Sequence, residues 1–418
     1  DKLKDYKNPD GTYRTWNIRA PHDPKPAYWD NMYYQVYESF RRVWQNRIFG
    51  DINASYQILP ELKASVFARA SFLNYGGDGR IASGGLEPAM YHINNGQFSE
   101  LNYEARVEYN KRFNNIGVRA LAGANFMNQN SRYNTATTVG GLSVPNLYSI
   151  TASVDRPSVG NTWLDNRINS VYGNVTLDYK NFIFIDAVLR NDWLTVLPMA
   201  KNNYLYPSIG TSIVFTDIIN SAGLKNVLNF GKIRAAFGRA GNPPDPYVLN
   251  PSYALGTPYG SNPTMSVPTT VYDQGLKPAL TKEYEIGTEL QFLRNRIGVD
   301  FTWYRKDGLD QIVDLTVTPS SGSNVVFINA GLIRSEGWEF VINATPVSTR
   351  DFRWDVQFNV ARNRSKVIDL DTARGLRNKN LGTATFGASV NARVGEEYGA
   401  FVGTRPLIDS KTGLPVIN

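Results

Sequence analysis

The chain has 418 residues, with 44 basic and 37 acidic side chains and a formal net charge of +7. This surplus is small for the length and forms no basic run, so the charge gives no sign of nucleic-acid binding. Cysteine is absent, which excludes a disulfide framework and a cysteine-based zinc site. Tyr, Phe and Trp make up 12% of the residues, and no stretch is long and apolar enough to predict a transmembrane helix.

Apolar residues recur at every second position in many segments, which is the period of a β-strand. We count about twelve such segments, many about ten residues long or longer, whereas strands of globular proteins average five or six. Clear examples are Ala64–Phe72, Tyr103–Tyr109, Ile116–Phe126, Val171–Tyr179, Ile183–Leu189, Ile233–Phe237, Ile297–Trp303 and Phe352–Val360.

The connections between these strands alternate in length. Short turns are predicted at Leu59–Glu61, Arg112–Asn115, Tyr179–Asn181, Leu293–Arg296 and Val347–Asp351, and long loops at residues 74–96, 127–165, 241–280 and 316–335. Two segments depart from this rule: TDIINSAGLKNV (216–227), which predicts a short helix, and the short loop Leu194–Asn203. Short turns on one side and long loops on the other are typical of an outer-membrane barrel.

The stretch NAGLIRSEGWEFVINATPV (329–347) raises the question of what its apolar face contacts. Trp338, Phe340 and Ile342 share one face of the strand, and Glu339 and Asn343 lie on the other. An apolar face against lipid and a polar face toward a lumen predict a membrane barrel, and the alternative is a large soluble β-protein with the apolar face in its core. Aromatic residues near strand ends would form interfacial girdles: Tyr103, Tyr109, Phe126, Tyr179, Trp193, Trp303 and Trp338.

Several stretches carry a more specific pattern. Residues 276–312, LKPALTKEYEIGTELQFLRNRIGVDFTWYRKDGLDQI, end in Tyr304, Lys306, Asp310 and Ile312 at the spacing Tyr-x-Lys-x-x-x-Asp-x-Ile. Together with INAGLIRSEGWEFVINATPV, GKIRAAFGRAGN, YLYPSIGTSIVF and the closing VGEEYGAFVGTRPLIDSKTGLPVIN, these residues resemble the SusC/RagA family of TonB-dependent outer-membrane transporters. The likeness covers most of residues 47–418 in order.

The resemblance implies an all-β fold, an antiparallel transmembrane β-barrel segment of about twelve strands within a larger barrel of about 22. Residues 1–46 would enter the barrel, 47–367 would form its strands, and 368–418 would be an extracellular extension. A plug and a TonB-contacting segment are not found here and are expected outside this chain. One departure is RNDWLTVLP (190–198), where the family has Arg-x-Asp-Gly-Ser-Ser.

The function implied by the resemblance is active import across the bacterial outer membrane. The substrate would be a large oligosaccharide or peptide, the partners TonB, a SusD-like lipoprotein and the lipid bilayer, with no cofactor, metal or nucleic acid. Loop residues that suit a polar ligand are Tyr133, Tyr148, Tyr247, Tyr253, Tyr259, Tyr272, Asn250 and Asp273. The alternative for each is packing within or between loops.

Two other functional classes are alternatives to import. An enzyme is disfavoured, because the two histidines, His22 and His92, fall in predicted loops without a neighbouring Ser and supporting polar partner. No Gly-x-Ser-x-Gly, Walker or His-Glu-x-x-His pattern is present. A structural or docking barrel in a larger surface complex, or a passive porin, stays open as an alternative to import.

Overall fold

The computed structural model describes residues 4–219, 227–256, 258–383, 387–405, 407–408 and 410–414. The chain divides into two compact units. The first consists of Asp1–Ala54, Val66–Glu104 and Phe126–Arg167, and the second of Ser55–Ser65, Ala105–Asn125 and Ile168–Asn418. Several strands run from one unit into the other. Among the described helices none is long and apolar enough to cross a membrane.

The described structure is nearly all β, and its main sheet has thirteen strands. One of them, β13 (Thr270–Tyr272), has three residues, and the others are the twelve long strands that the sequence predicts. They are β3 (Arg41–Leu59), β4 (Leu62–Ile81), β5 (Met90–Phe113), β6 (Ile116–Leu142), β7 (Ser153–Tyr179), β8 (Ile183–Leu194), β9 (Asn203–Val214), β10 (Leu228–Asn242), β14 (Ala279–Phe292), β15 (Ile297–Thr316), β16 (Val325–Ser348) and β17 (Arg353–Asp369).

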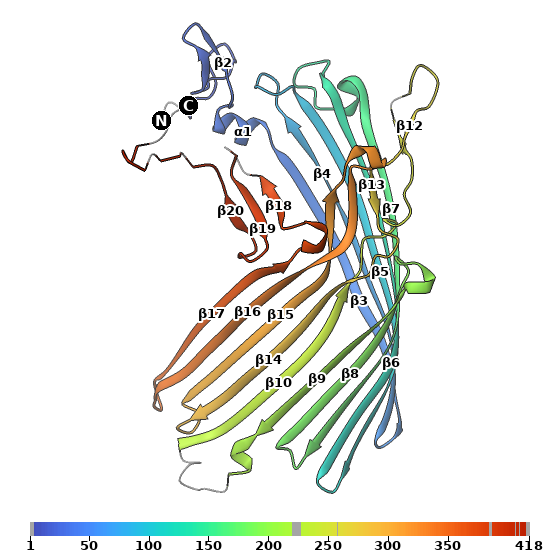
Figure 1. The fold of residues 1–418 in the computed structure, drawn as a ribbon, viewed down its shortest axis with the longest axis vertical. Coiled ribbons are helices and arrows are strands. Elements are labelled where there is room, and N and C mark those ends of the chain that lie inside the picture. Colours follow the sequence, from blue (N-terminus) through green and yellow to red (C-terminus); the bar gives the residue numbers. More distant parts are fainter. Residues whose placement is uncertain are drawn as a thin grey trace. The chain divides into compact units, whose positions relative to one another are not determined.

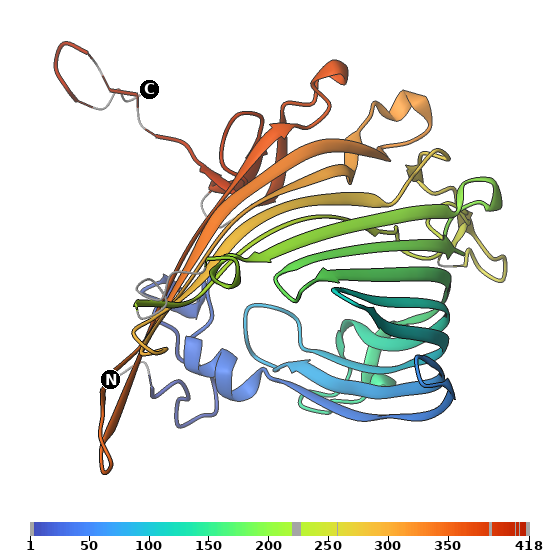
Figure 2. The same ribbon diagram turned by 90° about the horizontal axis from the view of Figure 1, so that it is seen from below.

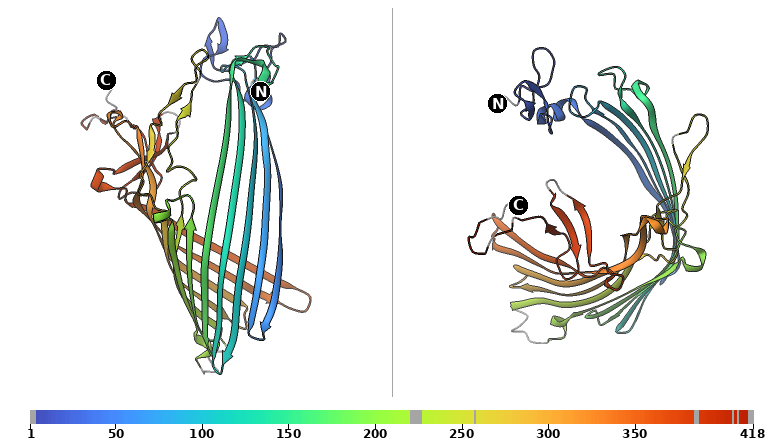
Figure 3. Two further views of the ribbon diagram at one scale, coloured as in Figure 1. Left: turned by 90° about the vertical axis from the view of Figure 1, so that its right-hand side faces the viewer. Right: turned by 45° about the horizontal axis from the view of Figure 1, so that its top comes forward.

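The strands pair in chain order, each with the next (Figure 1). Figure 3 shows β3 to β7 side by side, and Figure 2 shows the same succession of hairpins from β14 to β17. Pairing is antiparallel wherever two long strands meet in the second unit, whereas β13 pairs in parallel with the start of β16. The antiparallel all-β prediction is confirmed.

Smaller elements lie outside the twelve long strands. The first forty residues hold the hairpin of β1 and β2 and the helix α1. The described elements are β1 (Ile18–Ala20), β2 (Asp23–Pro26), α1 (Met32–Glu38), β11 (Ala254–Leu255), β12 (Met265–Ser266), β18 (Asn378–Thr383), β19 (Ser389–Arg393), β20 (Ala400–Val402), and 3₁₀ turns at Ile150–Ala152, Met199–Lys201, Phe215–Asp217, Pro319–Ser321 and Thr372–Arg374.

The predicted short turns are confirmed, since β3 ends at Leu59 and β4 begins at Leu62, and β14 ends at Phe292 and β15 begins at Ile297. Asn114 and Asn295 adopt positive φ angles of 50° and 63° in two of these turns, a conformation that asparagine tolerates better than most residues. The helix predicted at 216–227 begins as a 3₁₀ turn, and most of that segment lies outside the described residues.

Three predicted loops are too long. The strands continue into them, so the actual connections are residues 82–89, 143–152 and 317–324 instead of 74–96, 127–165 and 316–335. The strand bounds also extend the predicted 47–367 region to Arg41 and Asp369. The prediction failed because these strand ends carry polar and small residues on both faces. The two-residue period is therefore lost there, although the strands continue. The connection between β10 and β14 is long, as predicted.

The two faces of the sheet differ in chemistry. In the second unit Ile286, Phe301 and Trp303 share one face and are 54%, 39% and 37% exposed. Glu285 and Asp300 lie on the other face, where both contact Arg234. In the first unit Val66 and Phe72 are likewise exposed, and Arg69 on the opposite face pairs with Glu104. Exposed apolar side chains over whole strands are the pattern of a lipid-facing surface, not of a soluble core.

Candidate functional site

The polar face of the second unit carries an ion-pair network between three neighbouring strands. Both terminal nitrogens of the Arg234 guanidinium on β10 lie 3.1 Å from the two carboxylate oxygens of Asp300 on β15. Its Nε donates to Glu285 on β14 at 3.3 Å, and it also donates to the Thr302 hydroxyl. Gly287 faces Arg234 in register, and a Cβ there would lie 2.8 Å from the guanidinium carbon. The strand therefore leaves room for the arginine to lie flat on the polar face.

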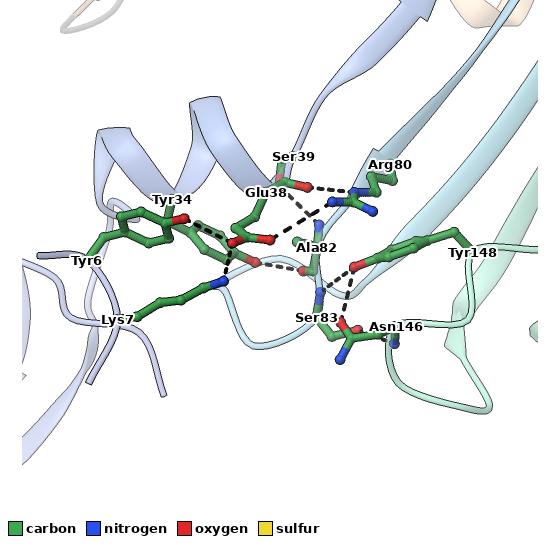
Figure 4. A network of polar contacts seen from close by, with 10 residues as sticks. All are labelled: Tyr6, Lys7, Tyr34, Glu38, Ser39, Arg80, Ala82, Ser83, Asn146 and Tyr148. Carbon is green, nitrogen blue, oxygen red and sulfur yellow. Dashed lines mark hydrogen bonds and ion pairs between the residues drawn. The ribbon is translucent and has the colours of Figure 1, made fainter. Parts of the chain in front are cut away.

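In the first unit, Tyr148 joins the two connections that follow β4 and β6 (Figure 4). Its hydroxyl accepts from the Ser83 backbone N–H at 3.4 Å and donates to the Asn146 side chain at 3.2 Å. The Arg80 guanidinium lies 4.4 Å from the centre of its ring. Tyr148 is half-buried, so part of its ring surface stays accessible while its hydroxyl organises the loops.

The helix α1 contacts the connection that follows β4 through Tyr34. The buried Tyr34 donates its hydroxyl proton to the Ala82 carbonyl at 2.7 Å, and burial raises the pKa of this phenol well above its usual range. The Glu38 carboxylate accepts from the Tyr6 hydroxyl at 3.0 Å and pairs with the Lys7 ammonium. The hydrogen bond from Lys7 holds the pKa of Glu38 below its ordinary value. These contacts fix residues 6–38 onto the loop end of the first unit (Figure 4).

The sequence interpretation missed the aromatic surface of this N-terminal segment. Tyr13 packs against Tyr34 with ring centres 4.1 Å apart, while Tyr28, Trp29 and Tyr37 are exposed. The high density of Tyr and Trp between residues 13 and 37 was the available signal. It carries no strand period, and the segment was therefore treated only as an extension.

Tyr133 does not lie in a loop, contrary to the prediction. It is part of β6, where its ring stacks on Tyr75 of β4 with centres 6.2 Å apart and an interplanar angle of 20°. Both rings lie on the extended parts of their strands that the sequence period did not reveal. Tyr133 thus keeps a partly exposed aromatic face on a rigid strand instead of a flexible loop.

The other predicted ligand-binding residues lie in the long connection between β10 and β14 and fall into two groups. Tyr272 belongs to β13 and stacks on Phe327 of β16, with ring centres 4.5 Å apart and an angle of 9°. Asp273 accepts from the Gly275 backbone N–H at 2.7 Å, which is a turn contact. The Tyr272 ring and the Asp273 carboxylate are therefore engaged in contacts within the protein. The exposed members of the predicted set, which are free to contact a ligand, are Tyr247, Asn250, Tyr253 and Tyr259.

The unusual RNDWLTVLP segment forms the anchor of this long connection. Leu194, Val196 and Leu197 are buried together with Leu249 and Leu276 from the connection. Arg190 donates to Asp192 at 2.7 Å and to Ser170 at 2.8 Å, so the arginine and aspartate of the family corner are ordered here. Of the residues at the Gly-Ser-Ser positions, Trp193 and Thr195 are exposed and Leu194 is buried, and Leu194 forms the core of the loop together with Val196 and Leu197.

Comparison with known proteins places the chain in a family. The model of the family described as TonB dependent receptor-like, beta-barrel, matches residues 2–405. "TonB-dependent receptor P26" of Formosa agariphila is 26% identical over 327 residues, covering 73% of this chain and 31% of that protein. "TonB-dependent receptor SusC" of Bacteroides thetaiotaomicron is 30% identical over 155 residues, covering 35% of this chain and 15% of that protein.

A solved structure of the RagAB peptide transporter has a similar fold, with a TM-score of 0.71 at 15% identity over 92% of this chain and 43% of the other. The ferric-catecholate import receptor Fiu from E. coli K12 aligns with a TM-score of 0.52 at 13% identity, over 84% of this chain and 52% of that chain. The chain thus spans less than a third of the curated relatives described above. The predicted resemblance to SusC/RagA-type proteins is confirmed, and the chain belongs to the TonB-dependent receptor-like β-barrel family.

Proposed function

We propose that the protein imports a large polar nutrient, an oligosaccharide or a peptide, across the bacterial outer membrane in a TonB-dependent manner. The observation that carries this proposal is the family match over residues 2–405, on a sheet with one exposed apolar face and one charged face. The two curated relatives are named as TonB-dependent receptors, and the structure with a similar fold is that of a peptide transporter. TonB and a SusD-like surface lipoprotein are the partners that the SusC and RagAB likeness supports.

The exposed edge strands support the view that this chain forms part of a larger barrel. Every residue of β3 is exposed, as are Arg353–Arg364 of β17. Unpaired strand edges of such length cannot face lipid, because no water is present there to satisfy the backbone. We infer that in the membrane further strands pair with both edges, and that residues 41–369 form only part of the wall.

Ligand binding by the exposed loop aromatics is a separate part of the proposal. Tyr253 and Tyr259 are 66% and 83% exposed, and a sugar ring or peptide side chain stacked on one of them gains about 0.5–1.5 kcal/mol. In the full-length protein, we expect Tyr253→Ala and Tyr259→Ala each to weaken substrate binding about two- to tenfold. Tyr272→Phe is the matched control, because that ring is already stacked on Phe327. Unchanged affinity in both alanine variants would remove these residues from the site.

The test of import uses cells that carry the full-length protein, with and without functional TonB. Radiolabelled oligosaccharides and, separately, oligopeptides are supplied, and their accumulation is measured. We expect one class to enter only when both TonB and the protein are present. Uptake without TonB would identify a passive porin. Failure of both classes, with a surface lipoprotein still bound, would favour the docking barrel.

A further inference from the structure

The apolar face of β14 to β17 changes to a charged surface within one step along the strands. Residues that lie directly opposite each other across the sheet form rows, and one row contains Ile286, Trp303 and Trp338. The next row on the same face, toward the long loops, reads Tyr284, Arg305, Glu336 and Arg364. The row beyond it reads Lys282, Asp307, Arg334 and Lys366. Such a change is expected where the hydrocarbon layer ends and the headgroups begin.

The two carboxylates in these rows are already engaged by arginines of the same rows. Asp307 accepts from Arg334 at 2.7 Å and from Arg305 at 3.1 Å, and Glu336 lies 3.8 Å from Arg305. The remaining cations of these rows are Lys282 of β14 and the cations of β17. Among the described residues, the ionic partner of Arg364 is Glu397, at a long distance of 3.7 Å and with both side chains exposed.

Arg362 and Lys366 lie two positions to either side of Arg364 on the same face. Within the described ranges neither has a carboxylate within 4.0 Å, and both are exposed. β17, the edge strand with which we infer that a further strand pairs, therefore presents three cations in a line, and two of them have no ionic partner in the part of the chain that the structure describes. Trp338 lies directly opposite Arg362.

The surface around these cations is hollowed. A depression of about 530 Å³ is lined by Arg334, Glu336, Arg364 and Lys366, together with Gly395 and Glu397. A second depression of about 270 Å³ is lined by Trp303, Trp338, Arg362 and Arg364, and it shares Arg364 and Glu336 with the first. A ligand lying across both would contact cations on its outer part and indole rings on its inner part.

We propose that this outward face of β15 to β17 binds the phosphorylated headgroup of an outer-leaflet glycolipid. Arg362, Arg364 and Lys366 would contact the phosphate, and Trp303 and Trp338 would lie at the level where acyl chains join the headgroup. The inference goes beyond nutrient import and shares with it only the placement in the outer membrane. A lipid fits better than a soluble anion, because the cations continue directly into the exposed apolar rows below them.

The test removes the three cations in the full-length protein by Arg362→Gln, Arg364→Gln and Lys366→Gln. Binding of phosphorylated lipid A, of dephosphorylated lipid A and of inorganic phosphate is measured in detergent by native mass spectrometry. Each cation near an anionic surface contributes about fivefold in affinity, so we expect the triple variant to bind phosphorylated lipid A roughly 100-fold more weakly. The control is Arg294→Gln, Arg350→Gln and Arg353→Gln, which removes equal charge from exposed residues at the opposite, short-turn end of the strands.

The proposal is supported if the control binds like the unmodified protein, and if removal of the lipid phosphate weakens binding as much as removal of the cations. Equal binding of lipid A by the triple variant would overturn it. Equal binding of inorganic phosphate and phosphorylated lipid A would reassign the surface to a soluble anion. Loss of a co-purifying protein in place of a lipid would reassign it to a protein interface. Nutrient accumulation measured in the same cells reports on import separately, so either proposal can fail alone.

Discussion

Substitution of an outward-facing residue by arginine should destabilise the membrane-inserted protein more, the further the residue lies from the charged rows. Val299 lies six residues from Arg305 on β15, with Phe301 and Trp303 between them on the same face. At about 3.4 Å per residue this is about 20 Å along the strand, or about 15 Å of depth for a strand tilted by about 40°. Since the apolar band of an outer-membrane barrel is about 25 Å tall, Val299 lies near its middle.

Val299→Arg should therefore destabilise the membrane-inserted protein by about 2–4 kcal/mol relative to Val299→Ala, and Trp303→Arg by only about 0–1 kcal/mol relative to Trp303→Ala. The assay is folding of the full-length protein into phosphatidylcholine vesicles as a function of urea concentration. Gln291→Arg is the control, since Gln291 lies on the polar face, opposite Gly298 and beside Glu289, and has room and a partner for a cation. A cost for Gln291→Arg that equals the cost at Val299 would refute the assignment of the two faces.

Two further predictions concern the loop ends. The pKa of Glu38 is lowered, mainly by its hydrogen bond from Lys7. The stability that Glu38 contributes to attachment of the N-terminal segment is therefore complete above the ordinary Glu pKa of about 4.3 and is lost as pH falls through the lowered pKa. Hydrogen exchange of α1 should become faster below that pH, and Glu38→Gln should abolish this pH dependence. Leu276 is 1% exposed in the cluster beneath the long connection, and Leu276→Ala should lower the local stability by about 2–5 kcal/mol. The loss should be seen as faster proteolysis of residues 243–278. Leu255→Ala in the exposed β11 should change the proteolysis rate little.

The sequence predicted the twelve strands well because one face of the sheet is apolar and the other is polar, which imposes a two-residue period on each strand. That period is visible in Ile297–Trp303 without any structural information. It fails where neither face contacts lipid or core, and the strand ends around Tyr75 and Tyr133 were therefore assigned to loops although they pair in the sheet.

The candidate site was harder to predict for a different reason. Whether a loop tyrosine is available depends on contacts with residues far away in sequence. Tyr272 and Tyr259 look equivalent in the sequence, yet one is stacked on Phe327 and the other is 83% exposed. The burial of RNDWLTVLP against Leu249 and Leu276 likewise depends on contacts between residues far apart in sequence, and no local sequence pattern predicts it.

The same two-face chemistry also explains why the register of these strands is so strongly specified. A slip of one residue in β10, β14 and β15 would turn Arg234, Glu285 and Asp300 toward lipid. Arg234 pairs with Gly287, which lies opposite Thr302, one residue from Trp303. Turned toward lipid, Arg234 would cost more than the about 0–1 kcal/mol expected at Trp303 and less than the about 2–4 kcal/mol expected near the middle of the bilayer. Gly287 adds a steric condition, because Arg234 lies flat only where its neighbour in register has no Cβ. Charge, lipid and one glycine therefore select the same pairing, and this pairing also places Trp303 and Trp338 side by side at the lower border of the charged rows.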